Sequence, residues 1–323
     1  MPKKSHFFSV FFSIFLLVVL VALYFNRIPL LDFVKASSYS PSADMQEIRD
    51  SLGLTPRALR IFNATHPRLD SRDEFNSDCS SSDPDIAVYG CYTSDKIFVY
   101  NISDPELAGF REATTAHELL HAVWYRLSDA EKSRLIPLLE ETYSLNESAL
   151  KDSLATYDES ERIDELYVRS ATQIKTLPAE LESHYSEIFT DQDSIVDFYN
   201  SYIAPFEELN EKIESLGSAL ESEKLEIDQK SAEYESRSYA FNSEVDSFNA
   251  CANIPGCFSS DYEFNTRRNE LLATASELDA LYSELGRLIE AYNAKVDEYN
   301  SNILRSNNLQ NLVNSNSKPE SLN

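Results

Sequence analysis

Two long runs of seven-residue repeats constrain the fold of this chain more than any other feature. Apolar or aromatic residues recur every seven positions over residues 206–248 and again over 264–299. Such rows form the seam of a coiled coil. The runs are separated by the segment CANIPGC, in which a Pro-Gly turn lies between Cys251 and Cys257. The sequence therefore predicts a long antiparallel coiled-coil hairpin of two helices over residues 206–305, with arms roughly 60 Å long.

Each arm also has a second seam row. In the first arm this row turns polar midway, at Glu223, Lys230 and Arg237. In the second arm we expect the second row four positions after the first, at Ala275, Tyr282, Ile289, Val296 and Ile303. Residues 306–323 are rich in Asn and Ser, so we predict a disordered tail there.

The N-terminal part of the chain contains a long apolar run. Positions 7–25 carry no charged residue and only two serines as polar interruptions. A helix of that length spans roughly 28 Å, close to a bilayer's hydrocarbon core, and the run exceeds the apolar region of a cleaved signal peptide (about 7–15 residues). We therefore expect an uncleaved transmembrane signal anchor over 7–25, with a cleaved signal peptide as the alternative. Lys3 and Lys4 place residues 1–6 in the cytoplasm, which gives a single-pass protein of the cell membrane with an extracytoplasmic body after a linker at 26–44.

The four cysteines fall into two short-range pairs, Cys79 with Cys91 and Cys251 with Cys257. Four cysteines allow three connectivities, and the local pairing fits the layout of the chain best. Two disulfide bonds would place the body in an oxidising, extracytoplasmic compartment. The alternative is four buried thiols.

Composition excludes several functions. The formal net charge is −26, and so acidic a surface repels a phosphate backbone, which argues against a nucleic-acid partner. The six glycines show no spacing typical of a nucleotide-binding loop.

Residues 45–205 are expected to form a mainly helical domain. Two β-rich runs at 86–92 and 96–102 predict a β-hairpin, and the pattern after it is helical. The predicted fold class is therefore mainly α with a small β-hairpin or edge sheet, an α+β domain, followed by the coiled-coil hairpin.

The residues with the clearest chemical meaning are His117, Glu118 and His121, which form the motif H-E-x-x-H in a predicted helix. Residues four apart share one face of a helix, so both imidazoles can reach one zinc ion. Glu118 faces the same cavity, where it can accept a proton as general base instead of binding the metal. The alternative is a pair of ordinary surface or core histidines.

A β-edge, an H-E-x-x-H helix and a Glu on a later helix together resemble the gluzincin branch of zinc metallopeptidases, the thermolysin-like arrangement. The resemblance covers residues 45–205, and only the five-residue motif is specific. The longer metzincin pattern fails, because Trp124 stands where it needs Gly and Leu127 where it needs a third His. The resemblance implies a zincin-like domain, Zn²⁺ as the cofactor and an acidic third ligand downstream.

The candidates for that third ligand lie within residues 161–169. In gluzincins the ligand Glu is commonly followed four residues later by an acid that supports a ligand His, which would make Glu161 the ligand. The family's Asn-Glu pair is better echoed by Asp164-Glu165, so we assign Glu165 and keep Glu161 as the alternative. A third interpretation is a solvated helix face on which Glu165 pairs with Arg169.

The resemblance implies a peptidase in which a zinc-bound water attacks the peptide carbonyl and Glu118 is the general base. Tyr143, Tyr157 and Tyr167 are candidates for stabilising the oxyanion, whereas His184 is expected to be exposed. The expected partners are a protein or peptide substrate, the membrane through the N-terminal helix, and a second copy or a partner protein on the coiled coil. The alternative function is a non-catalytic envelope scaffold or adhesion protein that acts through its hairpin, with a structural or vestigial zinc site.

Overall fold

The computed structural model of the chain describes residues 11–18, 27–79 and 88–316. The chain divides into two compact units, Met1–Pro205 with Gln310–Asn323 and Phe206–Leu309. Within the described ranges, no helix combines the length and the apolar character that crossing a membrane requires. The anchor predicted at 7–25 lies mostly outside these ranges, as does the segment 1–6.

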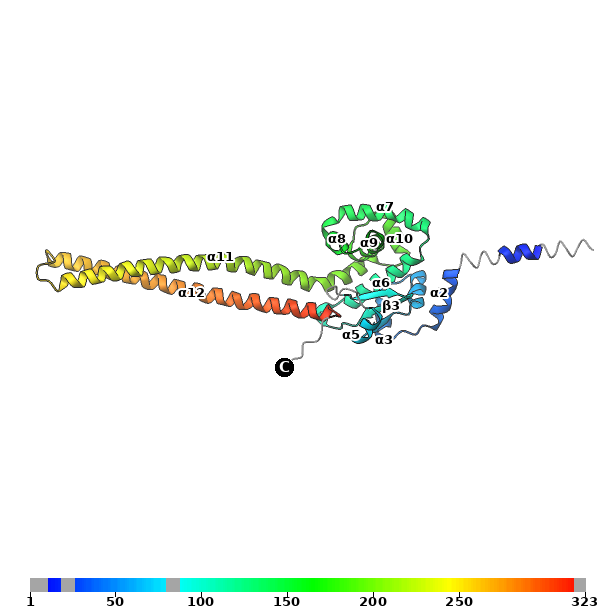
Figure 1. Cartoon of the computed structure of the whole chain (residues 1–323), viewed down its shortest axis with the longest axis horizontal. Coiled ribbons are helices and arrows are strands. Elements are labelled where there is room, and N and C mark those ends of the chain that lie inside the picture. The colour runs from blue at the N-terminus through cyan, green and yellow to red at the C-terminus, as the bar shows by residue number, and fades with distance from the viewer. Residues whose placement is uncertain (1–10, 19–26, 80–87, 317–323) are drawn as a thin grey trace, which may run out of the picture. The chain divides into compact units, whose positions relative to one another are not determined.

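The first unit is mainly helical, as predicted, and contains a small sheet (Figure 1). Its helices before the long α11 are α2 (Arg27–Ser38), α3 (Ala43–Ser51), α4 (Pro56–Ala64), α5 (Arg72–Asp78), α6 (Phe110–Arg126), α7 (Asp129–Leu145), α8 (Glu147–Leu154), α9 (Glu159–Gln173) and α10 (Ala179–Ser186), with a 3₁₀ turn at Pro105–Leu107.

The sheet has the strand order β1-β3-β2. The central strand β3 (Lys96–Tyr100) pairs antiparallel with β2 (Gly90–Thr93) and parallel with β1 (Arg68–Asp70). Ser94 and Asp95 connect β2 to β3 with positive φ angles of 52° and 58°, as in the tight turns that suit a twisted hairpin. The predicted hairpin is thus confirmed, with both strands shorter than the predicted runs 86–92 and 96–102, of which residues 86–87 lie outside the described ranges. β1 was not predicted, because three residues are too few to show a strand pattern.

The motif helix α6 lies at the centre of the first unit. It packs against β2, β3, α3, α4 and α9, and its apolar residues, Leu119 and Leu120 among them, are buried. Gly109 precedes it with a φ of 89°. A Cβ at this position would lie 2.4 Å from the carbonyl oxygen of Phe198, so only glycine can start the helix here.

The second unit is the predicted helical hairpin. It is built from the parts of α11 (Gln192–Ala252) and α12 (Asp261–Val313) that lie within Phe206–Leu309, and these two helices lie side by side (Figure 1). The three polar seam residues of the first arm all pair with residues of the other arm. These ion pairs are Glu223 with Lys295, Lys230 with Glu284 (2.9 Å) and Arg237 with Glu277 (2.5 Å). The residue number of the partner in α12 decreases as the residue number in α11 increases, so the two arms are antiparallel. The polar seam positions help to set the register between the arms.

The second seam row of α12 differs from the prediction at two of its five positions, whereas Ala275, Val296 and Ile303 are half-buried. Tyr282 and Ile289 are exposed, whereas Leu281, three positions after the buried Leu278, is itself buried. In a heptad repeat, the second seam position lies either three or four residues after the first. The sequence of one arm does not distinguish these two choices, because both positions are apolar here.

The C-terminal end of α12 also differs from the prediction. Residues 306–313, which the sequence placed in a disordered tail, continue the helix, and Leu309 and Val313 are buried. Ser315 is buried as well, and its carbonyl oxygen accepts a hydrogen bond from Asn76 Nδ2 at 2.8 Å. The Asn- and Ser-rich composition is typical of a disordered segment, which is why this helix end was not predicted. Residues 317–323 lie outside the described ranges.

Both predicted disulfides are confirmed. Cys79–Cys91 joins the end of α5 to β2, with the two Cα atoms 5.9 Å apart. Cys251–Cys257 closes the turn between α11 and α12, with a Cα separation of 5.4 Å. Each bond therefore closes a short local loop within one unit.

A buried ion-pair cluster fixes the C-terminal end of α6. Arg126 donates from Nε and Nη2 to the two carboxylate oxygens of Asp32 on α2, both at 2.9 Å. It also donates to Asp95 in the β2–β3 turn at 2.7 Å and to the Tyr92 hydroxyl at 3.1 Å. Burial disfavours the charge, but Asp32 and Asp95 outweigh it and raise the pKa of Arg126. One guanidinium thus joins α2, the hairpin turn and α6.

We expect Arg126→Leu to lower the free energy of unfolding by about 3–5 kcal/mol, because it leaves the buried carboxylate of Asp32 without a partner. The matched control is Arg134→Leu, which removes a half-exposed pair with Glu180 and should change stability by less than about 0.5 kcal/mol. Urea unfolding followed by the fluorescence of Trp124, the single tryptophan, measures both. Equal losses in the two variants would contradict the role of the cluster.

Candidate metal centre

The structure brings His117, His121 and Glu165 together into one group that could hold a metal ion. The two histidines lie one turn apart on α6, and Glu165 comes from α9, which packs against it. The two Nε2 atoms are 3.3 Å apart. Glu165 Oε1 lies 3.6 Å from His117 Nε2, and Oε2 lies 3.5 Å from His121 Nε2.

These separations are close to those around a tetrahedral zinc ion, with a different Glu165 oxygen nearest each imidazole and all possible ligand atoms within 4.8 Å of one another. With zinc–ligand bonds of about 2.0–2.1 Å, neighbouring ligand atoms of a tetrahedron lie about 3.4 Å apart. The side chains of His117 and His121 stay 22% and 20% exposed, so the group is open on one side. The residues therefore fit a metal held by three protein ligands.

Glu165 supplies a second sign that this group could hold a cation. It is only 2% exposed, and its Oε1 accepts no hydrogen bond among the described residues, although Arg169 Nε lies 2.7 Å away as an ion-pair partner. A buried carboxylate oxygen without a hydrogen bond is costly unless a cation completes its surroundings. A metal ion beside Oε1 would satisfy it.

Asp164 orients one of the two imidazoles. Its Oδ1 lies 3.0 Å from His121 Nδ1, so the other ring nitrogen, Nε2, faces His117 and Glu165. Such a contact from a carboxylate is typical of metal-binding histidines. In the sequence, Asp164 stands out only as the acidic neighbour of Glu165. The signal for its role was an acid directly beside the ligand Glu.

The two histidines and Glu165 differ in protonation state when no metal is bound. Burial disfavours protonated His121, but Asp164 and Glu165 overcome it and raise its pKa to about 10. Burial lowers the pKa of His117 to about 3. Burial also opposes the charge of Glu165, yet His117, His121 and Arg169 lower its pKa to about 2. A metal ion would therefore find one neutral imidazole and a carboxylate, and would displace one proton from His121.

Glu118 lies next to this group in a different environment. It is 5% exposed, and the backbone N–H of Tyr92 on β2 favours its charged form only slightly. Burial raises its pKa to about 7, and the negative charges of Glu165 and Asp164 add to the effect while His121 opposes it. A carboxyl group with a pKa near 7 can both take up and release a proton at neutral pH.

Gly90 lets the edge strand β2 pass directly over Glu118. A Cβ on Gly90 would lie 2.7 Å from Thr114 Cγ2 and 2.8 Å from both Cγ and Oε1 of Glu118. Any other residue here would have to displace the side chains of Thr114 and Glu118. The close approach of β2 explains much of the burial of Glu118.

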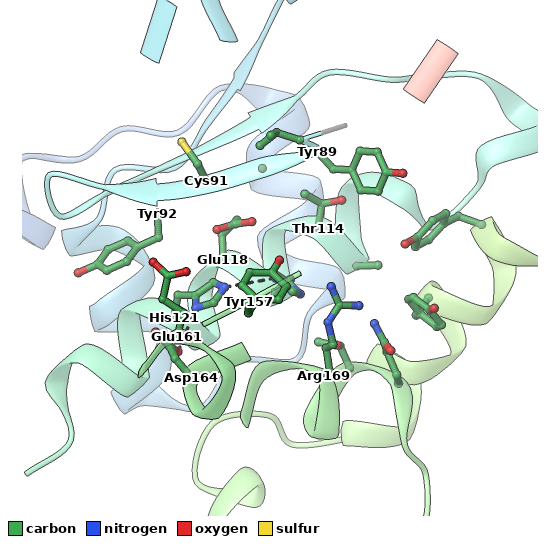
Figure 2. A pocket seen from close by; sticks show the side chains of 18 residues that line it. Tyr89, Cys91, Tyr92, Thr114, Glu118, His121, Tyr157, Glu161, Asp164 and Arg169 are labelled. Carbon is green, nitrogen blue, oxygen red and sulfur yellow. Dashed lines mark hydrogen bonds and ion pairs between the residues drawn. The ribbon is translucent and has the colours of Figure 1, made fainter. Parts of the chain in front are cut away.

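The group opens into a cavity of about 620 Å³ (Figure 2). His117, Glu118 and His121 line one part of it, and Tyr157 and Arg169 line another. Figure 2 shows Glu118, His121, Asp164 and Arg169 around this space, from α6 and from α9. Glu161 also lines the cavity but does not belong to the metal-holding group.

Only one of the three candidate tyrosines lines this cavity, namely Tyr157. Tyr143 lies under the guanidinium of Arg162, whose Cζ is 4.6 Å from the ring centroid. Tyr167 is fully buried, and its hydroxyl lies 2.9 Å from His184 Nε2. His184 is thus buried, contrary to the prediction of an exposed side chain, because α10 turns it toward α9. The prediction was wrong because the acidic residues next to His184 in the sequence are typical of an exposed helix face.

No protein-family model matches the chain, and neither a curated protein nor a solved structure matches it. The similarity to gluzincins therefore rests on the H-E-x-x-H motif and on the geometry of the three possible ligands.

We expect Glu165→Gln to weaken zinc binding by more than about 100-fold, because it removes a ligand charge and not merely a supporting contact, which typically costs 10–100-fold. Glu161→Gln, four residues earlier on the same helix, is the matched control and should leave the affinity unchanged. Competition with a chromophoric chelator measures both. A loss in the Glu161 variant with none in the Glu165 variant would move the third ligand to Glu161.

Glu118→Gln should stabilise the metal-free protein in a pH-dependent way. Since folding raises the pKa of Glu118 from 4.5 to about 7, its charge opposes folding as the pH rises through this range. We expect the variant to gain about 3 kcal/mol over the native chain at pH 8.5 and nothing at pH 4. Urea unfolding at both pH values, with the exposed Glu161→Gln as control, measures the difference. An equal gain at both values would contradict the buried-carboxylate account.

Proposed function

We propose that this chain is a membrane-anchored, extracytoplasmic, zinc-dependent peptidase. The observation that carries the proposal is the group of His117, His121 and Glu165, spaced for zinc and open to a cavity that Glu118 also lines. Structural zinc sites are closed by four protein ligands, whereas catalytic sites use three and leave one position open. Three such residues gather in the part of the chain that the structure describes, which favours a catalytic site.

In the proposed reaction, Zn²⁺ held by His117, His121 and Glu165 would lower the pKa of a water molecule and polarise the carbonyl of the peptide. Glu118 takes a proton from the attacking water on its carboxylate. It then gives this proton to the amine nitrogen as the C–N bond breaks, so water is consumed and two peptides leave. Tyr157 is the candidate for a hydrogen bond to the carbonyl oxygen, because it lines the same cavity.

The location of the proposed peptidase rests on two features. Both disulfides favour an oxidising compartment. The apolar run at 7–25 favours attachment to a membrane from outside the cytoplasm. The coiled-coil unit is proposed to bind a partner protein or a second copy of the chain.

Glu118→Gln tests the proposal directly. We expect it to keep one zinc per chain and to lose casein hydrolysis by about 10²–10⁴-fold, because the carboxylate that moves the proton is gone while the ligands remain. Zinc content and turnover are measured on the same samples, with Glu141→Gln, an exposed residue of α7 outside the cavity, as the control that keeps both.

An active Glu118→Gln would exclude Glu118 as the general base. A native chain without zinc and without turnover would favour the alternative, a scaffold or adhesion protein that acts through its hairpin.

A further inference from the structure

In helix α2 the usual pattern of a surface helix, with apolar residues inside and charged residues outside, is reversed. The acidic residue Asp32 is buried, whereas the large apolar residues point outward. The exposed fractions are 47% for Leu30, 56% for Leu31, 66% for Phe33 and 65% for Val34. Apolar side chains gathered on one exposed helix face mark a contact with another apolar phase or molecule.

The orientation of α2 is set by its polar contacts. Asp32 forms the two-bond pair with Arg126, and Lys35 forms an ion pair with Asp95. Turning the apolar face inward would break both contacts and would leave Arg126 buried without its main partner. The outward position of the four apolar side chains is therefore built into the fold.

The position of α2 in the chain indicates what covers this face. The apolar run ends at Phe25, and α2 begins at Arg27. Two residues span at most about 7 Å, and the helical rise from Arg27 to Val34 adds roughly 10 Å. If residues 7–25 lie in a bilayer, the apolar face of α2 must lie close to its surface, whatever the path of the connection.

We propose that the face of α2 formed by Leu30, Leu31, Phe33 and Val34 lies in the interface of a lipid bilayer, so that α2 is an interfacial helix beside the anchor. This inference rests on the membrane anchor of the proposed function and not on its catalytic chemistry. Apolar burial, not charge, provides the binding, since the chain carries a net charge of −26. Through Arg126, the same helix holds the C-terminal end of α6.

The test places a tryptophan at Phe33 in the full chain, reconstituted into phosphatidylcholine vesicles with and without bromine-labelled acyl chains. We expect the added emission of Phe33→Trp to be blue-shifted and to lose about half or more of its intensity with brominated lipid, because interfacial helices bury their apolar side about 5–10 Å deep. The signal of the native chain, from Trp124 alone, is subtracted. The matched control is Leu145→Trp at the end of α7, an apolar residue that is 74% exposed, and it should not be quenched.

Two outcomes would overturn the inference while leaving the anchor intact. A red-shifted, unquenched signal from vesicle-bound Phe33→Trp would show that α2 faces water. A blue-shifted, unquenched signal would show that protein covers the face, either a second copy or a partner. A chain that does not float with the vesicles would overturn both the anchor and this inference, whereas casein hydrolysis on the same samples reports separately on the catalytic proposal.

Discussion

The burial of one carboxylate, Glu165, is the constraint on which the rest of the first unit depends. A negative charge that is 2% exposed is tolerated only with compensation, and it comes from the protonated His121 of α6 and from Arg169 on its own helix. This requirement holds α9 against α6 at a distance that suits a metal ion. The same charge helps to raise the pKa of Glu118 beside it. The charge of Glu165 thus affects both the packing of α9 against α6 and the pKa of the candidate general base.

The motif helix is held firmly at both of its ends, which keeps its side chains in place. Gly109 lets the chain pass tightly against Phe198 at the start, and the ion pairs of Arg126 fix the end. Between these points Gly90 allows β2 to press on Glu118. Helices and strands position a site more accurately than loops do, and the three possible ligands and Glu118 all lie on α6 and α9.

Features with short, repeating or local signals could be predicted from the sequence, and features decided by distant partners could not. Residues four apart on a helix must share a face, so the pairing of His117 with His121 followed from the motif alone. The contact of Asp164 with His121 and the burial of His184 depend on how α9 and α10 pack, which no local pattern reveals. In the same way, the choice of Leu281 over Tyr282 for the seam depends on the opposite arm.

Anomalous diffraction at the zinc edge, from crystals of the zinc-loaded chain, would locate the metal and its ligands. We expect one zinc ion bound by Nε2 of His117, Nε2 of His121 and the carboxylate of Glu165, with solvent in the fourth position. A fourth protein ligand, such as Asp164 or Glu161, would close the site and make it structural. That result, or a zinc ion bound elsewhere, would contradict a catalytic metal centre.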